Sequence, residues 1–251
     1  MRDAEYGKMF DVEDAHWWYA SLHRLIRDVV AGERAGKGPL EIFDAGCGTG
    51  RLCQLLSEFG AVSGCDMSRL AVDRCAERGL PDISLLDLND GDVGRSRYDV
   101  VTSIDVLYHQ WVKDEAAVLR KLGDALRPGG VLIFQSPAFR FLRSRHDAAV
   151  LTGRRYTKKQ VRRLVEEAGL AVETITYRVF FLFPLIAAYR FAQKPFVGRR
   201  GAAVVSDVAM PPLLINRMLL KVHLWENALL KRRSLPFGTS VFAVARKPLR
   251  R

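Results

Sequence analysis

The sequence predicts an α/β fold with a largely parallel sheet, and three observations predict it. Short apolar runs alternate with helical stretches along residues 40–137. These runs are apolar throughout, as in strands that are buried on both faces of a parallel sheet. A glycine-rich turn, Asp44–Gly50, follows the first run and precedes a helix, where open parallel sheets bind ligands. The 251 residues, 49% of them hydrophobic, are enough for one large domain of this class.

A helical segment is predicted ahead of the sheet, over the first forty residues. The aromatic cluster His16–Tyr19 leads into the run Leu22–Val30, whose apolar residues recur at helical spacing. Gly36–Pro39 then breaks the pattern. Because Trp and Tyr combine a large apolar surface with a polar tip, we expect residues 1–39 to form a lid over a ligand site.

Apolar runs bounded by turn residues predict five strands, at Leu40–Phe43, Ala61–Cys65, Ile83–Leu86, Tyr98–Ile104 and Val131–Gln135. Three helices are expected between them: one from the glycine turn to about Phe59, one from the Ser68 cap through Arg78, and one over Val112–Leu126. Arg127–Gly130 stops the last of these helices.

The pattern changes after residue 137. Residues 138–160 are basic and irregular, Lys158–Ala168 predicts a helix, and Ala171–Phe183 alternates before it becomes fully apolar. Residues 185–235 read as helical, with an interruption at 195–212. Apolar residues recur there at steps of three and four and predict one apolar face, made of Ile215, Met218, Val222, Trp225 and Leu229. Thr239–Lys247 predicts a closing strand.

Charge is divided unevenly along the chain. The net charge is +11, but residues 1–137 carry −6 and residues 138–251 carry +17. The basic half raises nucleic acid, an anionic membrane or an acidic substrate as partners. The four cysteines lack CxxC spacing, which favours reduced thiols over a metal site. The polar N-terminus is no signal peptide, and the apolar run Val179–Tyr189 is too short to span a bilayer, so we expect a cytoplasmic protein.

The turn Asp44–Gly50 is typical of a nucleotide-type cofactor site. Glycines let the backbone approach a ligand closely, and the following helix offers free N–H groups. Arg51 stands where a dinucleotide motif has its third glycine. Asp66, which closes the next strand, suits two ribose hydroxyls. Nicotinamide and adenosyl cofactors both carry such hydroxyls, so the turn and Asp66 leave both open.

Further motifs follow this turn in order, at Asp66–Ser68, Leu86–Leu88, Tyr98–His109 and Leu126–Gly130. Together they resemble class I S-adenosylmethionine-dependent methyltransferases over roughly residues 40–137. The leader His16–Tyr19, the segment His146–Thr157 and the ending Leu235–Ser240 are similar to the type 11/12 branch of that superfamily.

This resemblance implies a Rossmann-like, seven-stranded sheet with helices on both faces. A basic and apolar helical insertion would precede the last, antiparallel strand. The expected division is a helical lid over 1–39, the cofactor-binding core over 40–184, the helical cover over 185–235 and the terminal strand segment over 236–251.

The resemblance also implies S-adenosyl-L-methionine as cofactor and a role for each matching residue. The turn, with Asp44, Gly46, Cys47 and Gly48, would cradle the aminocarboxypropyl end. Asp66 would hold the ribose hydroxyls, and Met67 would lie beside the adenine. Asp87 would accept from the adenine amine, and the Leu88 amide would face the ring. Ser103, Ile104 and Asp105 would form the floor beneath the sulfonium, and Tyr19 would close over the cofactor. Leu22 departs from the branch, which usually has an arginine there.

Two histidines are candidates for a general base. His146 is followed by Asp147 in a polar loop after the fifth strand, where a carboxylate would orient the ring. His109 follows the fourth strand at the edge where an acceptor would enter, although a histidine there is often structural. No metal ligand set is expected.

The leading hypothesis is methyl transfer to a small or lipophilic organic acceptor, at O, N or C. The fourth-strand motif Ser103–Val106 is not the one that base-amine methyltransferases carry, which disfavours nucleic acid. An RNA methyltransferase that uses the basic half remains the enzyme alternative, and a cofactor-binding protein that no longer transfers methyl is the third. Peripheral membrane contact fits the basic, apolar second half. The oligomeric state stays open.

Overall fold

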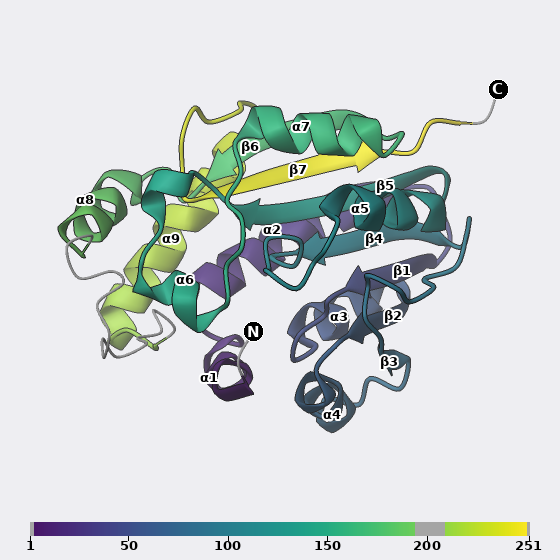
Figure 1. Cartoon of the computed structure of the whole chain (residues 1–251), viewed down its shortest axis with the longest axis horizontal. Helices are drawn as coiled ribbons and strands as arrows, with labels where there is room; N and C mark the ends of the chain where they lie inside the picture. The colour runs from purple at the N-terminus through teal and green to yellow at the C-terminus, as the bar shows by residue number, and fades with distance from the viewer. Residues whose placement is uncertain (1–2, 194–208, 250–251) are drawn as a thin grey trace.

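The computed structural model describes residues 3–193 and 209–249 and has a central mixed sheet of seven strands (Figure 1). The spatial order of the strands is β3-β2-β1-β4-β5-β7-β6. β7 pairs antiparallel with both β5 and β6, and the other strand pairs are parallel. Their bounds are β1 Leu40–Ala45, β2 Gly60–Asp66, β3 Ile83–Leu85, β4 Tyr98–Ile104, β5 Leu126–Pro137, β6 Ala171–Arg178 and β7 Ser240–Arg246. The Rossmann-like, seven-stranded sheet predicted from the sequence is confirmed.

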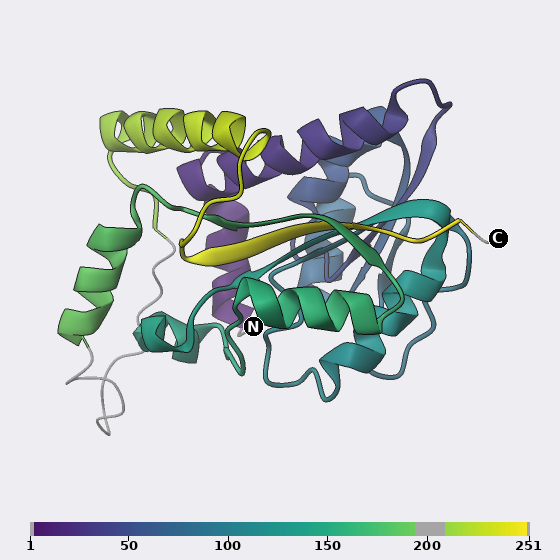
Figure 2. The same cartoon turned by 90° about the horizontal axis from the view of Figure 1, so that it is seen from above.

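Helices cover both faces of this sheet (Figure 2). One face packs against α2 (Trp17–Arg34), α3 (Arg51–Leu56) and the end of α9 (Leu213–Leu230). The other face packs against α5 (Glu115–Ala125) and α7 (Lys158–Glu167). An apolar core therefore covers each face of the sheet. The ends of the strands remain available for a ligand-binding site.

The remaining helices lie around the carboxyl end of the sheet or at its rim. They are α1 (Asp3–Val12), α4 (Arg69–Glu77), the short α6 (Arg145–Ala149) and α8 (Phe183–Gln193), with single 3₁₀ turns at Ser57–Phe59 and Arg140–Leu142. Figure 1 shows α8 and α9 together at one end of the molecule. The predicted interruption at 195–212 falls largely on residues 194–208, outside the described residues.

Two predicted segments differ in detail from the structure, and local hydrogen bonds explain why. Asp114 accepts from the amides of Ala116 and Ala117, so α5 begins there rather than at Val112. The stretch around His146, expected to be irregular, contains the single-turn helix α6. A capping box between Ser144 and Asp147 starts that turn.

Helix α9 is inverted relative to an ordinary amphipathic helix. Its predicted apolar face is largely exposed: Met218 is 57% and Trp225 is 58% accessible. The buried face carries polar residues instead, namely Asn216, His223, Glu226 and Asn227. Asn216 and Asn227 bind backbone groups at the start of α2 and just before it, and Glu226 binds amides of the loop after β6. His223 binds the Leu219 carbonyl within α9. These hydrogen bonds therefore help to attach α9 to the core, beside the packing of Leu230.

Candidate active site

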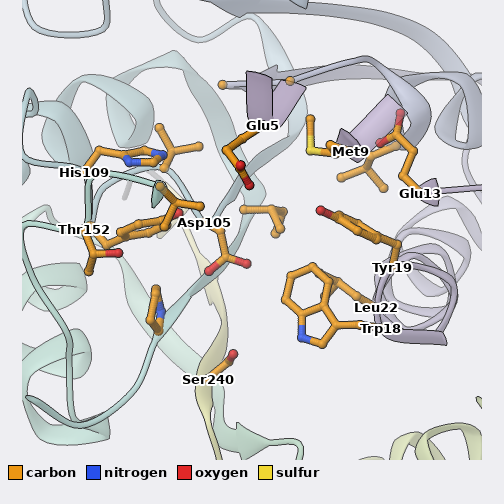
Figure 3. A pocket seen from close by; sticks show the side chains of 18 of the residues that line it. Glu5, Met9, Glu13, Trp18, Tyr19, Leu22, Asp105, His109, Thr152 and Ser240 are labelled. Carbon is orange, nitrogen blue, oxygen red and sulfur yellow. The ribbon is translucent and has the colours of Figure 1, made fainter. Parts of the chain in front are cut away.

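A cavity of about 580 Å³ opens at the carboxyl ends of β1, β2 and β4. Helices α1 and α2 form one wall, with Glu5, Met9, Trp18 and Tyr19, and loops that follow the sheet form the other (Figure 3). The sequence-predicted lid residues therefore line the same cavity as the glycine turn. The cavity has a cofactor half near β1 and β2 and a second half toward α6 and α8.

The glycine turn shapes the floor of the cofactor half. Gly46 and Gly48 have φ of 82° and 56°, a region that residues with a side chain rarely adopt. A Cβ at Gly46 would collide with Val106, and one at Gly48 would lie 2.7 Å from the Met9 Cε. The amides of Gly46 and Cys47 donate to the Cys65 carbonyl, which fixes the turn on β2. The turn thus brings bare backbone to the cavity.

Asp66 ends β2 and is buried at the wall of the cavity. Its Oδ2 accepts from the Gly48 amide at 3.0 Å, and its Oδ1 accepts from the Ser68 amide at 2.9 Å. The Tyr6 hydroxyl of α1 also donates to Oδ1, at 3.0 Å. Burial raises the pKa of the Asp66 carboxyl. Asp66 is thus an oriented hydrogen-bond acceptor, and it is already bonded to Tyr6 of α1 in the wall of the cavity.

The other predicted cofactor residues mostly line the same half. Asp87 and Leu88 follow β3, and Met67 follows β2 with its side chain exposed at the rim. Asp44 also reaches the cavity and accepts from the Thr102 hydroxyl at 2.6 Å. Burial raises the pKa of Asp44 to about 6.

Ser103 is the exception among the predicted cofactor residues. It is fully buried within β4 and is not among the residues that line the cavity. Strand residues alternate between faces, so the side chain of Ser103 turns into the sheet packing. Ile104 and Asp105 line the cavity at this position instead.

Tyr19 and Leu22 reach the cavity from α2. Burial raises the pKa of the Tyr19 hydroxyl, which keeps it protonated. Leu22, where the similar branch usually has arginine, is a fully buried apolar residue. Arg78, which caps the end of α4, pairs with Glu13 at 2.8 Å. That ion pair ties the lid to α4.

Asp105, predicted as part of the floor beneath the sulfonium, occupies a central place in the cavity (Figure 3). It stands directly after β4 with φ of 55°, and its carboxylate faces the middle of the cavity (Figure 3). Gln135 donates to its Oδ2 at 2.7 Å, and the buried Arg178 donates to Gln135 at 2.7 Å. Burial raises the pKa of Asp105 to about 6. The signal was the one used for Asp66, an acidic residue closing an apolar strand.

His109 lines the cavity but sits in a packed environment. Its ring stacks on Trp111 with a centroid distance of 4.2 Å. Burial lowers its pKa to about 3, so the ring is neutral at physiological pH. Its Nδ1 is buried, and no hydrogen-bond partner lies within the described parts of the chain.

His146 lines the second half of the cavity from α6. Its neighbour Asp147, expected to orient the His146 ring, also forms an internal ion pair. Asp147 accepts from the Arg155 guanidinium at 2.8 and 3.0 Å and from the Ser144 amide at 2.7 Å. Arg155 thereby holds the pKa of Asp147 below its usual range despite burial. The carboxylate is therefore engaged in an internal ion pair that helps to fix α6.

The residues present fit S-adenosylmethionine. The turn offers backbone where a Cβ would fill the space, and Asp66 offers a carboxylate at the strand end for two vicinal hydroxyls. Asp87 and Leu88 lie where an adenine would follow. In the described residues, no cluster of three or more His, Cys, Asp or Glu side chains could hold a metal ion.

The sheet order, the glycine turn and the acid after β2 together define a class I S-adenosylmethionine-dependent methyltransferase. Solved structures share this fold. A methyltransferase of this type from Mesorhizobium loti has a TM-score of 0.56 and 18% identity, over 93% of this chain and 99% of that one. The [4+2]-cyclase SpnF has a TM-score of 0.58 and 21% identity, over 93% and 83%.

The chain belongs to the family described as "Methyltransferase domain", whose sequence model matches residues 17–175. Its cofactor is S-adenosylmethionine. Curated relatives include the ubiquinone biosynthesis O-methyltransferases of Proteus mirabilis and of a Methylobacterium species. The first is 32% identical over 51% of this chain and 57% of its own length; the second is 30% identical over 71% and 86%. The chain thus spans little more than half of several curated relatives that it matches.

Proposed function

We propose that the protein transfers a methyl group from S-adenosylmethionine to a hydroxyl of a small, lipophilic organic acceptor. One observation carries this proposal: the cavity continues past the cofactor half into a second half with an apolar wall. Its apolar side chains come from β5, α6, the loop after β6 and α8, and are Pro137, Val150, Val179 and Ile186. An apolar acceptor would gain free energy by leaving water there.

The work of the chain's own residues is mainly positioning. S-adenosylmethionine supplies a methyl group on a sulfonium whose leaving group is a neutral thioether. The turn around Gly46 and the carboxylate of Asp66 would fix one reactant, while the apolar half would hold the other in line with it. The α1 and α2 roof, with Tyr19 and Trp18, would exclude water.

Hydroxyl acceptors are favoured by the relatives, several of which are named as O-methyltransferases. A catechol with an alkyl chain combines an ionisable hydroxyl with an apolar tail. We expect the purified protein to form S-adenosylhomocysteine with 4-alkylcatechols. The KM should fall as the chain lengthens, by up to about fourfold per methylene group, because each buried CH₂ contributes about 0.8 kcal/mol.

Calorimetry with S-adenosylhomocysteine distinguishes the readings left open by the sequence. Cofactor binding with no turnover on any acceptor of the series would contradict the proposal and favour a protein that binds the cofactor without transferring methyl. A KM that does not depend on the length of the alkyl chain would contradict a lipophilic acceptor.

The second part of the proposal is contact with an anionic bilayer through an α8/α9 face. We define this face by its exposed apolar residues: Leu185, Tyr189, Leu213, Leu214, Ile215, Met218 and Trp225. Exposed cations of α9, Arg217 and Lys221, lie between them in the sequence. Exposed apolar side chains and cations at one end of the molecule match a membrane with acidic lipids. In the described residues no helix is long and apolar enough to cross a bilayer.

Vesicle sedimentation tests this contact. The protein should sediment with vesicles that contain phosphatidylglycerol, less with pure phosphatidylcholine, and salt should release it. Leu214→Glu should weaken the binding, because Leu214 is 80% exposed on the face. Leu85→Glu is the matched control, since Leu85 is exposed on the edge strand β3. Equal binding by both variants, or salt-sensitive binding to RNA instead, would contradict the proposal.

A further inference from the structure

Asp105 has a backbone φ of 55°, a conformation that residues with a side chain rarely adopt. It is one of the described non-glycine residues with positive φ, and Figure 3 shows its carboxylate between the α2 wall and the wall that carries His109 and Thr152. Such a backbone conformation costs free energy and tends to persist where a site requires it. Here it turns a charged side chain out of β4 and into the cavity.

The hydrogen bonds around Asp105 fix what each atom can do. A guanidinium only donates, so the Oε1 of Gln135 must face Arg178 and its amide nitrogen must face Asp105. Oδ2 of Asp105 is therefore always an acceptor. Any proton that Asp105 takes up has to sit on Oδ1, for which the described residues provide no hydrogen-bond partner.

We propose that Asp105 is the general base of the reaction, and that Oδ1 takes the proton of the acceptor's hydroxyl. Gln135 and Arg178 are positioning residues that hold the carboxylate ionised and aimed. This inference rests on the proposed methyl transfer and narrows it to acceptors that carry an ionisable hydroxyl.

The step balances in atoms and charge. The hydroxyl O–H bond breaks and its proton goes to Oδ1, while the oxygen forms a bond to the methyl carbon and the carbon–sulfur bond breaks. The sulfonium charge and the carboxylate charge disappear together, which leaves a methyl ether, S-adenosylhomocysteine and a neutral Asp105. The proton then passes to water when the product leaves.

The surroundings of Asp105 favour this exchange near neutral pH. Burial raises its pKa to about 6, against the opposing effect of Gln135, Arg178 and Arg155. Tyr19 and Tyr108 also face it, and both stay protonated because burial raises their pKa values. A base with a pKa close to the working pH is ionised and still basic enough to take a proton.

The test compares Asp105→Asn with Asp82→Asn, an exposed aspartate before β3, using 4-hexylcatechol as acceptor. Asp105→Asn should lower kcat by about 10²- to 10⁴-fold and leave the affinity for S-adenosylhomocysteine near that of the wild type. Asp82→Asn should leave both unchanged. If Asp105→Asn keeps full turnover, or loses cofactor affinity in proportion to turnover, the proposal is overturned.

Two further measurements separate a base from a structural carboxylate. In the wild type, log kcat should fall below about pH 6, and Gln135→Met should move this limb to higher pH, because it removes a hydrogen bond from the ionised form. The carboxyl ¹³C resonance of Asp105, followed without any acceptor, should titrate near pH 6. A midpoint at or below 4 would overturn the proposal.

The carboxyl titration does not depend on turnover, so the two failures are distinguishable. If no alkylcatechol is methylated but Asp105 titrates near 6, the proposed acceptor class is wrong while the basic carboxylate stands. If alkylcatechols are methylated and Asp105→Asn is fully active, the proposed function stands and the base is elsewhere.

Discussion

The buried carboxylate of Asp66 connects the glycine turn, the start of α4 and helix α1 in the cofactor half. Both oxygens are oriented by backbone amides, and one is shared with Tyr6. Without its carboxylate, two ribose hydroxyls would lose their acceptor in a partly dry site, at a cost of about 1–3 kcal/mol. Asp66→Ala should therefore weaken S-adenosylhomocysteine binding by roughly 5- to 150-fold in calorimetry, with an unchanged fold by circular dichroism. If this variant binds S-adenosylhomocysteine as tightly as the wild type, Asp66 does not hold the ribose hydroxyls.

The histidines predicted as bases are tested by the same assay. Since Asp105 provides a base, we expect His146→Ala and His109→Ala each to keep kcat within about tenfold of the wild type. A loss of about 10²–10⁴-fold in His146→Ala alone, with intact cofactor binding, would instead assign the proton to His146. The same loss confined to His109→Ala would assign it to His109.

The sequence predicts the role of Asp66, but it does not show the contacts that Arg178, Asp147 and Arg155 make in the fold. Asp66 follows an apolar strand and precedes a capped helix, a pattern visible without coordinates. The use of Arg178 depends on burial: it is 0% exposed inside a strand pattern that reads as alternating. Asp147 and Arg155 are both visible as charges in the sequence, but only the fold shows that they form an ion pair.

At the scale of elements, α1 forms part of the cavity wall, and hydrogen bonds and ion pairs in and just after α1 already connect it to the cofactor half. Tyr6 donates to Asp66, Glu13 binds Thr49 and Arg78, and the Phe10 ring lies 4.6 Å from both Arg74 and Arg78. The ribose hydroxyls and the Tyr6 hydroxyl would therefore compete for one carboxylate oxygen.

Tyr6→Phe removes this competitor and keeps the ring. A typical hydrogen bond contributes about 0.5–1.5 kcal/mol net, so the variant should bind S-adenosylhomocysteine about 2- to 12-fold more tightly. Stopped-flow fluorescence of the lid tryptophans should also show faster association. Weaker binding would mean that the Tyr6 hydroxyl contacts the cofactor instead of competing with it.

Elements were easier to predict than their orientation. The strands β1, β2 and β4 were found within a few residues, because continuous apolar runs between turn residues have few other interpretations. Helix α9 was predicted as well, with one apolar face in a helical cover, but the sequence does not show which way that face turns. It faces outward because Glu226 binds the amides of Val179 and Phe180 and Asn227 binds Ser21, long-range contacts with no local signal.

Across the whole molecule, the carboxyls of the site make stability depend on pH. Asp44 and Asp105 both have pKa values raised to about 6, whereas an unfolded chain releases these protons near pH 4. The folded state binds more protons between these values, so these two groups destabilise the fold at neutral pH and cease to do so as the pH falls toward 4.

Asp105→Asn removes one of these buried charges. The variant should be more stable than the wild type at pH 8, by about 1–2 kcal/mol in urea unfolding, and the difference should vanish near pH 4. Asp82→Asn serves again as the control. A variant that is less stable at pH 8 would show that the carboxylate supports the fold, which would also weaken its assignment as a base.

Helix α8 gives the cavity and the α8/α9 face a common border, since Ile186 and Arg190 line the cavity while Leu185 is exposed on the face. An enzyme placed in this way would take its acceptor from a plane rather than from a volume. Its rate would then follow the mole fraction of acceptor within the lipid, not the amount per litre. Adding inert phosphatidylglycerol at a fixed total of acceptor would slow the reaction even though no inhibitor is present, a surface-dilution effect that a freely diffusing enzyme does not show.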